Sequence, residues 1–61
     1  MQTVYSVQGK IDGRFRQLQV FESRANAVGL ANGFLQSFHV VVEEFVENGT
    51  VSRGIVFDNQ K

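Results

Sequence analysis

His39 and Asp58 are the residues whose chemistry is best suited to proton transfer. His39 is the one histidine in the chain, and the strand pairing argued below places Asp58 across from it, where a carboxylate orients an imidazole. Nucleophilic catalysis also needs a hydroxyl or thiol held beside the base. The chain has no cysteine, and we expect no serine or threonine beside this pair. We interpret it as a surface pair near a strand end and predict that the protein is not an enzyme.

Three glutamates lie close together in the sequence, but their spacing does not suit acid–base chemistry. Glu43 and Glu44 are adjacent on an expected strand, so they point to opposite faces and cannot share a proton. Glu43 and Glu47 share a face but lie about 13 Å apart at the rise of a strand. The same distance separates His39 from Glu43. We therefore predict no metal site.

Gly29 and Gly33 form a G-x-x-x-G spacing within the expected helix, on the side that also carries Asn32. Neither of the glycine-rich phosphate-binding motifs, G-x-x-x-x-G-K-[ST] and G-x-G-x-x-G, occurs in the chain, so we predict no nucleotide cofactor. Small residues at this spacing let another backbone approach a helix closely. This uncharged outer face is therefore a candidate docking surface.

Basic residues and an aromatic gather around the first expected turn. Lys10, Arg14 and Arg16 surround Phe15, and such a combination can hold phosphates and stack on bases. The formal net charge is zero, however, and the second half of the chain is acidic, which opposes binding to a long nucleic-acid backbone. Nucleic-acid binding is accordingly the alternative hypothesis and not the leading one.

The stretch from Ser23 to Phe38 is the one segment with helical periodicity. Ser23 is a natural N-cap, and the apolar residues fall within an arc of roughly 160° that faces a core. We expect the last helical turn to unwind around Gln36 and Ser37. The stripe comprises Ala27, Val28, Leu30, Ala31, Phe34, Leu35 and Phe38.

A hairpin is predicted on either side of this helix. Asp12-Gly13 suits a two-residue turn of type I′, and Asn48-Gly49 is an even stronger hairpin signal. Regular pairing from these turns gives seven facing pairs in which apolar residues largely meet on one side. They are Ile11 with Arg14, Val7 with Leu18, Tyr5 with Val20, Val46 with Val51, Glu44 with Arg53, Val42 with Ile55, and Val40 with Phe57. On the other side the second hairpin brings together Phe45 with Ser52, Val41 with Val56, and His39 with Asp58.

The predicted fold is α+β, a single domain over residues 1–61 in the order β-β-α-β-β. A right-handed crossover that skips a strand gives a four-stranded antiparallel sheet in the order 2-1-3-4, with the helix on one face. Strand order 1-2-3-4 is the alternative. The other sheet face is expected to stay open and to carry an apolar surface large for a monomer. Its residues are Phe15, Phe21, Val41, Phe45 and Val56. We expect residues 58–61 to form a frayed tail.

Length and composition limit the setting of this domain. Sixty-one residues allow a small core and thin stability, and without cysteines no disulfide can add to it. Self-association as a homo-oligomer is therefore expected. The first ten residues do not resemble a signal peptide, and no apolar run approaches a membrane span. We predict a cytoplasmic protein with no membrane contact.

In length and element order, with no catalytic residues apparent, the chain resembles small phage-encoded host-takeover proteins. These include phage inhibitors of bacterial RNA polymerase and anti-CRISPR proteins. The resemblance implies a small non-enzymatic inhibitor or regulator that binds a host protein surface, and it carries over no functional residue. From the residues themselves we predict a partner-binding surface made of Arg14, Phe15, Arg16, Phe21, Gly29, Asn32, Gly33 and Phe45.

Overall fold

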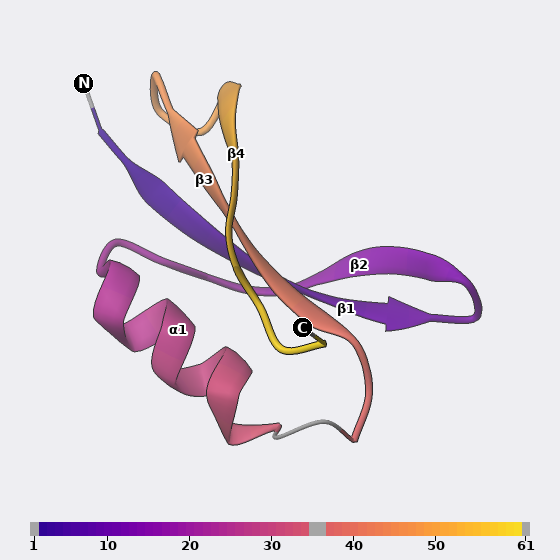
Figure 1. Ribbon diagram of the computed structural model, residues 1–61. Coiled ribbons are helices and arrows are strands. Elements are labelled where there is room, and N and C mark those ends of the chain that lie inside the picture. Colours follow the sequence, from indigo (N-terminus) through magenta and orange to yellow (C-terminus); the bar gives the residue numbers. More distant parts are fainter. Residues whose placement is uncertain (1, 35–36, 61) are drawn as a thin grey trace.

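The computed structural model describes residues 2–34 and 37–60. Four strands and one helix follow one another along the chain (Figure 1). Their bounds are β1 Val4–Ile11, β2 Arg14–Phe21, α1 Arg24–Gly33, β3 Val40–Val46 and β4 Val51–Asp58.

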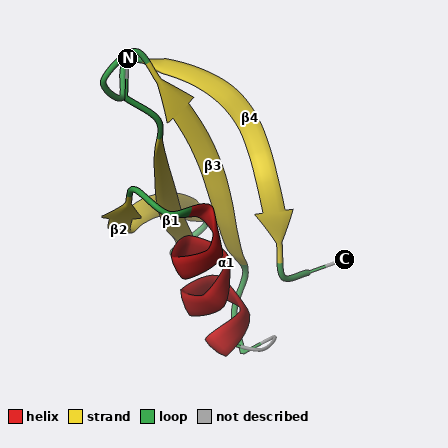
Figure 2. Cartoon of the chain, turned by 90° about the vertical axis from the view of Figure 1, so that its left-hand side faces the viewer, coloured by secondary structure: helices red, strands yellow, loops and turns green. Residues whose placement is uncertain are grey.

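The four strands form one antiparallel sheet in the order β2-β1-β3-β4, which confirms the predicted strand order. The helix packs on one face of this sheet, chiefly against β1 and β3 (Figure 2). The predicted α+β fold, with a single helix on a four-stranded sheet, is therefore correct. The order makes β2 and β4 the two edge strands.

Both turns adopt the left-handed backbone that their sequences predicted. Asp12 and Gly13 have φ angles of 55° and 81°, as the two central residues of a type I′ turn require. The second connection is longer, since residues 47–50 separate β3 from β4. It includes Asn48 and Gly49 at φ angles of 60° and 88°. The predicted pair of Val46 with Val51 closes it.

The helix begins as predicted and ends earlier. Ser23 Oγ accepts a hydrogen bond from the Asn26 backbone N–H at 3.3 Å, so it caps the N-terminus. The helix ends at Gly33, before the unwinding expected at Gln36 and Ser37. Of the predicted stripe, Ala27 and Ala31 are buried, and Leu30, Phe34 and Phe38 pack around them as part of the same apolar cluster. Leu35 and Gln36 lie outside the described residues.

A β-bulge changes which side chains of β2 face the helix. Ile11 pairs with Arg14 as predicted, but Gln8 pairs with Gln17 and Val7 with Gln19, so Leu18 is an extra residue in β2. The predicted pairings of Val7 with Leu18 and of Tyr5 with Val20 are therefore wrong. Because a slip of one residue reverses every side chain beyond it, the two faces of β2 exchange after the bulge.

Phe21 and Val20 show the consequence of this exchange. Phe21 pairs with Tyr5 and packs against the core, so its predicted position on the open face is wrong. Val20 pairs instead with Ser6, and 42% of it is exposed. The bulge thus brings an aromatic ring against the core and turns a valine away from it.

Two further irregularities occur in β4, where Arg53 and Val56 are the extra residues opposite β3. The pair Phe45–Ser52 is as predicted, but Glu44 pairs with Gly54 and Val42 with Phe57. The predicted pairings of Glu44 with Arg53, Val42 with Ile55, Val41 with Val56, and Val40 with Phe57 are wrong. Gly54 has a φ of 104°, a conformation that side chains rarely adopt. That flexibility at Gly54 lets β4 absorb an extra residue.

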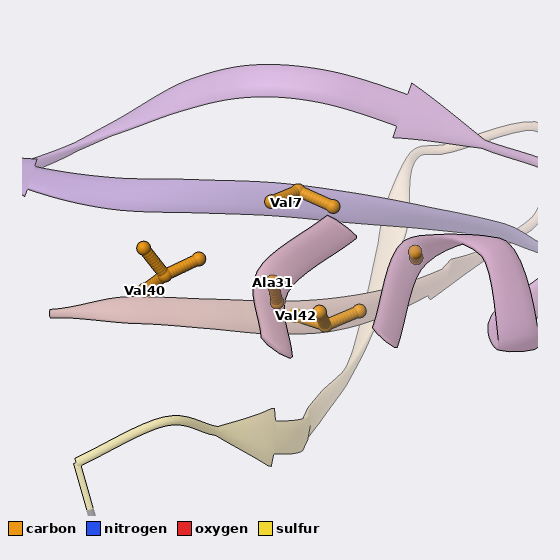
Figure 3. Close-up of a cluster of buried hydrophobic side chains, with 5 residues drawn as sticks. Val7, Ala31, Val40 and Val42 are labelled. Carbon is orange, nitrogen blue, oxygen red and sulfur yellow. The ribbon is translucent and has the colours of Figure 1, made fainter. Parts of the chain in front are cut away.

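The core formed under the helix is small. It consists of Val7, Val40, Val42, Ala27 and Ala31 (Figure 3). Over residues 2–34 and 37–60, no fully buried side chain is larger than a valine. Aromatic rings surround this centre but stay partly exposed. Because burial of apolar area is the main favourable term in folding, a core of this size leaves the domain a narrow margin of stability.

The chain after β4 is held in place and does not fray as expected. Asn59 is only 7% exposed. Its Oδ1 accepts a hydrogen bond from the Val40 backbone N–H at 2.8 Å, and its Nδ2 donates one to the Phe38 carbonyl at 2.8 Å. The Asn59 backbone N–H donates to the Val40 carbonyl at 3.1 Å. Asn59 therefore fixes the start of β3. Lys61 lies outside the described residues.

Candidate interaction surfaces

The outer side of α1 carries a shallow depression of about 230 Å³. Gly29 and Gly33 are exposed and form part of its lining, and the half-buried side chains of Leu30 and Phe34 form the rest. Asn32 is exposed on the same helix. The three helix residues predicted for partner binding thus lie on accessible surface beside an apolar hollow.

Nothing within the fold explains why glycine occupies residues 29 and 33. A Cβ built on either residue meets no atom of residues 2–34 and 37–60 within 4 Å, and neither residue has a positive φ. Glycine within a helix costs about 1 kcal/mol relative to alanine. The two glycines therefore lower the stability of a short helix with no steric gain inside the chain. Because glycine has no side chain, the hollow is deeper at these two residues than it would be with alanine.

The other predicted surface lies at the far end of the first hairpin. Lys10, Arg14, Phe15 and Arg16 are all exposed there, around the Asp12-Gly13 turn. The ring of Phe15 meets the imidazole of His39 edge to face, with 5.0 Å between the centroids. The sheet therefore presents cationic groups and an aromatic ring together at this end.

The side chains of His39 and Asp58 contact one another, with Nε2 and Oδ1 2.8 Å apart, although Asp58 pairs with Val41 and not with His39 as predicted. Both side chains are about one-third exposed. The aromatic neighbour of His39 is Phe15, which carries no nucleophile. Over residues 2–34 and 37–60, no three histidine, aspartate or glutamate side chains converge as a metal site would require. The pair can link β3 to β4. Its geometry fits the surface pair expected from the sequence and points to no catalytic role.

A hydrogen-bonded polar cluster crosses the sheet face opposite the helix, and sequence reasoning missed it. Glu43 of β3 lies at its centre and accepts hydrogen bonds from Gln8 Nε2 of β1, at 2.9 Å, and from Ser52 Oγ of β4. Ser6 Oγ, which is 2% exposed, donates to Gln17 Oε1 of β2 at 3.2 Å. Gln8 Nε2 also donates to Ser6 Oγ at 3.3 Å, so the cluster joins all four strands.

This cluster and the burial around it correct the expectation that the open face carries an apolar surface large for a monomer. Val41 lies on that face but is buried, and Phe45 is half-buried opposite Val4. Val56 and Phe21 pack against the core instead. Of the five residues expected there, Phe15 is the one large exposed side chain, at 43%. Alternation of glutamine and serine along the first two strands was the available signal for a polar centre.

A second hollow, of about 480 Å³, lies along β4 and is lined by Ile55, Val56, Phe57 and Asp58. All four lining residues come from one edge strand, so the hollow lies along an open edge of the sheet.

Comparison with models of protein families, with curated protein sequences and with solved structures found no match to this chain. Within residues 2–34 and 37–60, no helix is long and apolar enough to cross a membrane. The function is therefore argued from the surfaces themselves.

Proposed function

We propose that this chain is a small non-enzymatic protein-interaction module that acts in the cytoplasm by covering a surface of a partner protein. The observation that carries this proposal is the hollow on α1, in which two glycines flank Leu30 and Phe34. Small residues beside apolar ones let a partner backbone approach closely while it buries carbon surface. An inhibitor or regulator of the kind found among small phage proteins would act in this way.

Gly29 and Gly33 support this proposal because they lower the stability of the isolated domain. Alanine at residue 29 or 33 would fit without a clash and would favour the helix. A role in binding gives these residues a benefit that folding does not. Asn32 is exposed on the same helix and offers an amide that can donate and accept hydrogen bonds.

The test is affinity capture from a native-host lysate with the wild-type chain and with the double variant Gly29→Ala plus Gly33→Ala. The added methyl groups take up part of the hollow and keep a partner backbone farther from the helix. We expect the variant to bind the captured protein more weakly and to unfold at a higher temperature. Ala25→Ser changes another exposed residue of the same helix and serves as the matched control. Equal capture by wild type and double variant would remove the hollow from the proposal.

The second candidate function is binding of nucleic acid through the first hairpin. The specific observation in its favour is the exposed group of Arg14, Phe15 and Arg16 at one end of the sheet. Its test is binding of single-stranded oligonucleotides across a salt series, with Arg14→Ala plus Arg16→Ala as the variant. Binding that falls steeply with salt and disappears in the variant would support this function. Capture of one protein that survives nuclease treatment would favour the first.

A further inference from the structure

The outer edge of β2 is suited to pairing with another strand. β2 is an edge strand, and each of its residues from 14 to 20 is exposed. Three of them are large and apolar: Phe15 at 43%, Leu18 at 40% and Val20 at 42% exposed. An edge strand also leaves backbone N–H and C=O groups available for another chain.

The direction of those backbone groups follows from the pairing of β1. The Lys10 backbone N–H donates to the His39 carbonyl at 2.8 Å, so at Lys10 the hydrogen-bonding groups of β1 point toward β3. Backbone direction alternates along a strand, so Ser6 also points toward β3. Phe15 is opposite Lys10 and Val20 is opposite Ser6. At Phe15 and Val20 the backbone groups of β2 therefore point outward, away from the sheet.

The bulge at Leu18 makes these two residues equivalent. In a regular strand, residues 15 and 20 would lie on opposite faces, because they are separated by an odd number of positions. The extra residue at the bulge shifts the alternation by one position, so the side chains of Phe15 and Val20 both lie on the sheet face opposite the helix. One strand therefore offers two outward-facing backbone positions, each with an exposed apolar side chain on the same face.

We propose that a second copy of this chain pairs with that edge. The two β2 strands run antiparallel about a two-fold axis, with Phe15 of each copy opposite Val20 of the other. Each of the two pairs exchanges two backbone hydrogen bonds and joins two half-exposed apolar side chains. The result is a continuous sheet of eight strands. Any shift by one residue would set Phe15 opposite a side chain of the helix face, so one register is favoured.

Charge favours a second copy over an unrelated strand. β2 begins with Arg14 and Arg16, and Glu22 follows its end. Antiparallel pairing brings Arg14 of one copy beside Phe21 of the other, one position from Glu22. Arg14 of each copy therefore lies one position from Glu22 of the other, on opposite faces of the sheet, and this approach occurs twice across the axis, as an isologous interface requires.

The other edge is less suited to such pairing. β4 carries two extra residues, and Gly54 has a φ of 104°. Bulges that twist an edge strand are a common protection against pairing with another chain, and β4 has two of them where β2 has one. The pairing through β2 also leaves the hollow on α1 accessible, and it does not depend on the function proposed for that hollow.

The first test is sedimentation equilibrium over a dilution series, with circular dichroism to verify the fold of each variant. We expect a reversible dimer for the wild-type chain and at least tenfold weaker association for Val20→Lys, which places a cation beside Phe15 and the arginines of the second copy. Ile55→Lys, on the same sheet face of β4 and 53% exposed, is the matched control and should dimerise as the wild type does. A monomer at every concentration would overturn the proposal. A dimer disrupted by Ile55→Lys and not by Val20→Lys would also do so.

The second test fixes the register and uses the absence of native cysteines. In the proposed dimer, the Cα atoms of Phe15 and of Val20 in the second copy lie about 5.5 Å apart, within reach of a disulfide. Residue 15 lies roughly 17 Å from its own counterpart. Mixing Phe15→Cys with Val20→Cys should give a covalent dimer, whereas mixing Phe15→Cys with Ile55→Cys should not. A dimer linked equally well in Phe15→Cys alone would contradict this register.

Discussion

The ring of Phe38 lies over the backbone of Gly9, in the space that a side chain at residue 9 would fill. A Cβ built on Gly9 would lie 2.5 Å from Phe38 Cε2 and 3.0 Å from Leu18 Cδ1. Gly9 pairs with Val40 of β3, beside the small core. The absence of a side chain there lets an aromatic ring cover the centre of the sheet where the helix has already ended.

Replacement of Gly9 by alanine should therefore destabilise the domain. The methyl group would force Phe38 and Leu18 aside, and overpacking of this kind costs typically about 1–3 kcal/mol. Urea denaturation monitored by circular dichroism measures the change in the free energy of unfolding. A variant as stable as the wild type would mean that the ring moves away at no cost.

Replacement of the helix glycines by alanine should instead stabilise the domain. The methyl groups of Gly29→Ala and Gly33→Ala would meet no atom of the described residues within 4 Å, so each variant should raise the free energy of unfolding by up to about 1 kcal/mol. The same denaturation experiment measures both, and Gly9→Ala provides the contrast. A loss of stability in either helix variant would show that the glycine has a role within the fold, and it would weaken the argument for docking at the hollow.

Sequence patterns predicted the elements and their order, because the signals for them are local. Asp12-Gly13 and the capping serine at residue 23 each determine a backbone conformation by themselves. The strand faces were less predictable, since a bulge inserts one residue into an otherwise regular alternation. Leu18 lies between two glutamines, and nothing in this local sequence indicates a bulge. Gly54, a glycine within a strand, was a usable signal that pairing near Arg53 is irregular.

The candidate surfaces were predictable to the same extent. Features set by local sequence could be predicted, and features that depend on strand pairing could not. The outer helix face was predictable, because Gly29 and Gly33 oppose helix formation whatever the sheet does. The position of Phe21 was not, because it depended on a bulge three residues earlier. The position of Phe15 relative to His39 depends on the spacing of three strands, which no local pattern contains.

Asn59 should be among the most sensitive residues outside the core. Its side chain satisfies the Val40 N–H and the Phe38 carbonyl, and Asn59→Ala would leave both without this partner. A buried donor without a partner costs about 1–3 kcal/mol, so we expect a loss of that size in the free energy of unfolding. Asn32→Ala, at an exposed helix position, is the matched control and should cause no loss. Similar values for the two variants would contradict the anchoring role of Asn59.

Glu43 provides a corresponding test for the polar cluster on the sheet face opposite the helix. Its carboxylate accepts from Gln8 and Ser52, and it lies half-buried between two strands. We expect Glu43→Ala to lower the free energy of unfolding by about 1–2 kcal/mol, since bonds to a charged acceptor are the stronger ones and partial exposure reduces them. Glu47→Ala, in the exposed turn, should change it by less than about 0.5 kcal/mol. A double-mutant cycle between Glu43→Ala and Ser52→Ala isolates their coupling, and a coupling near zero would mean that the cluster adds polarity to this face without stabilising it.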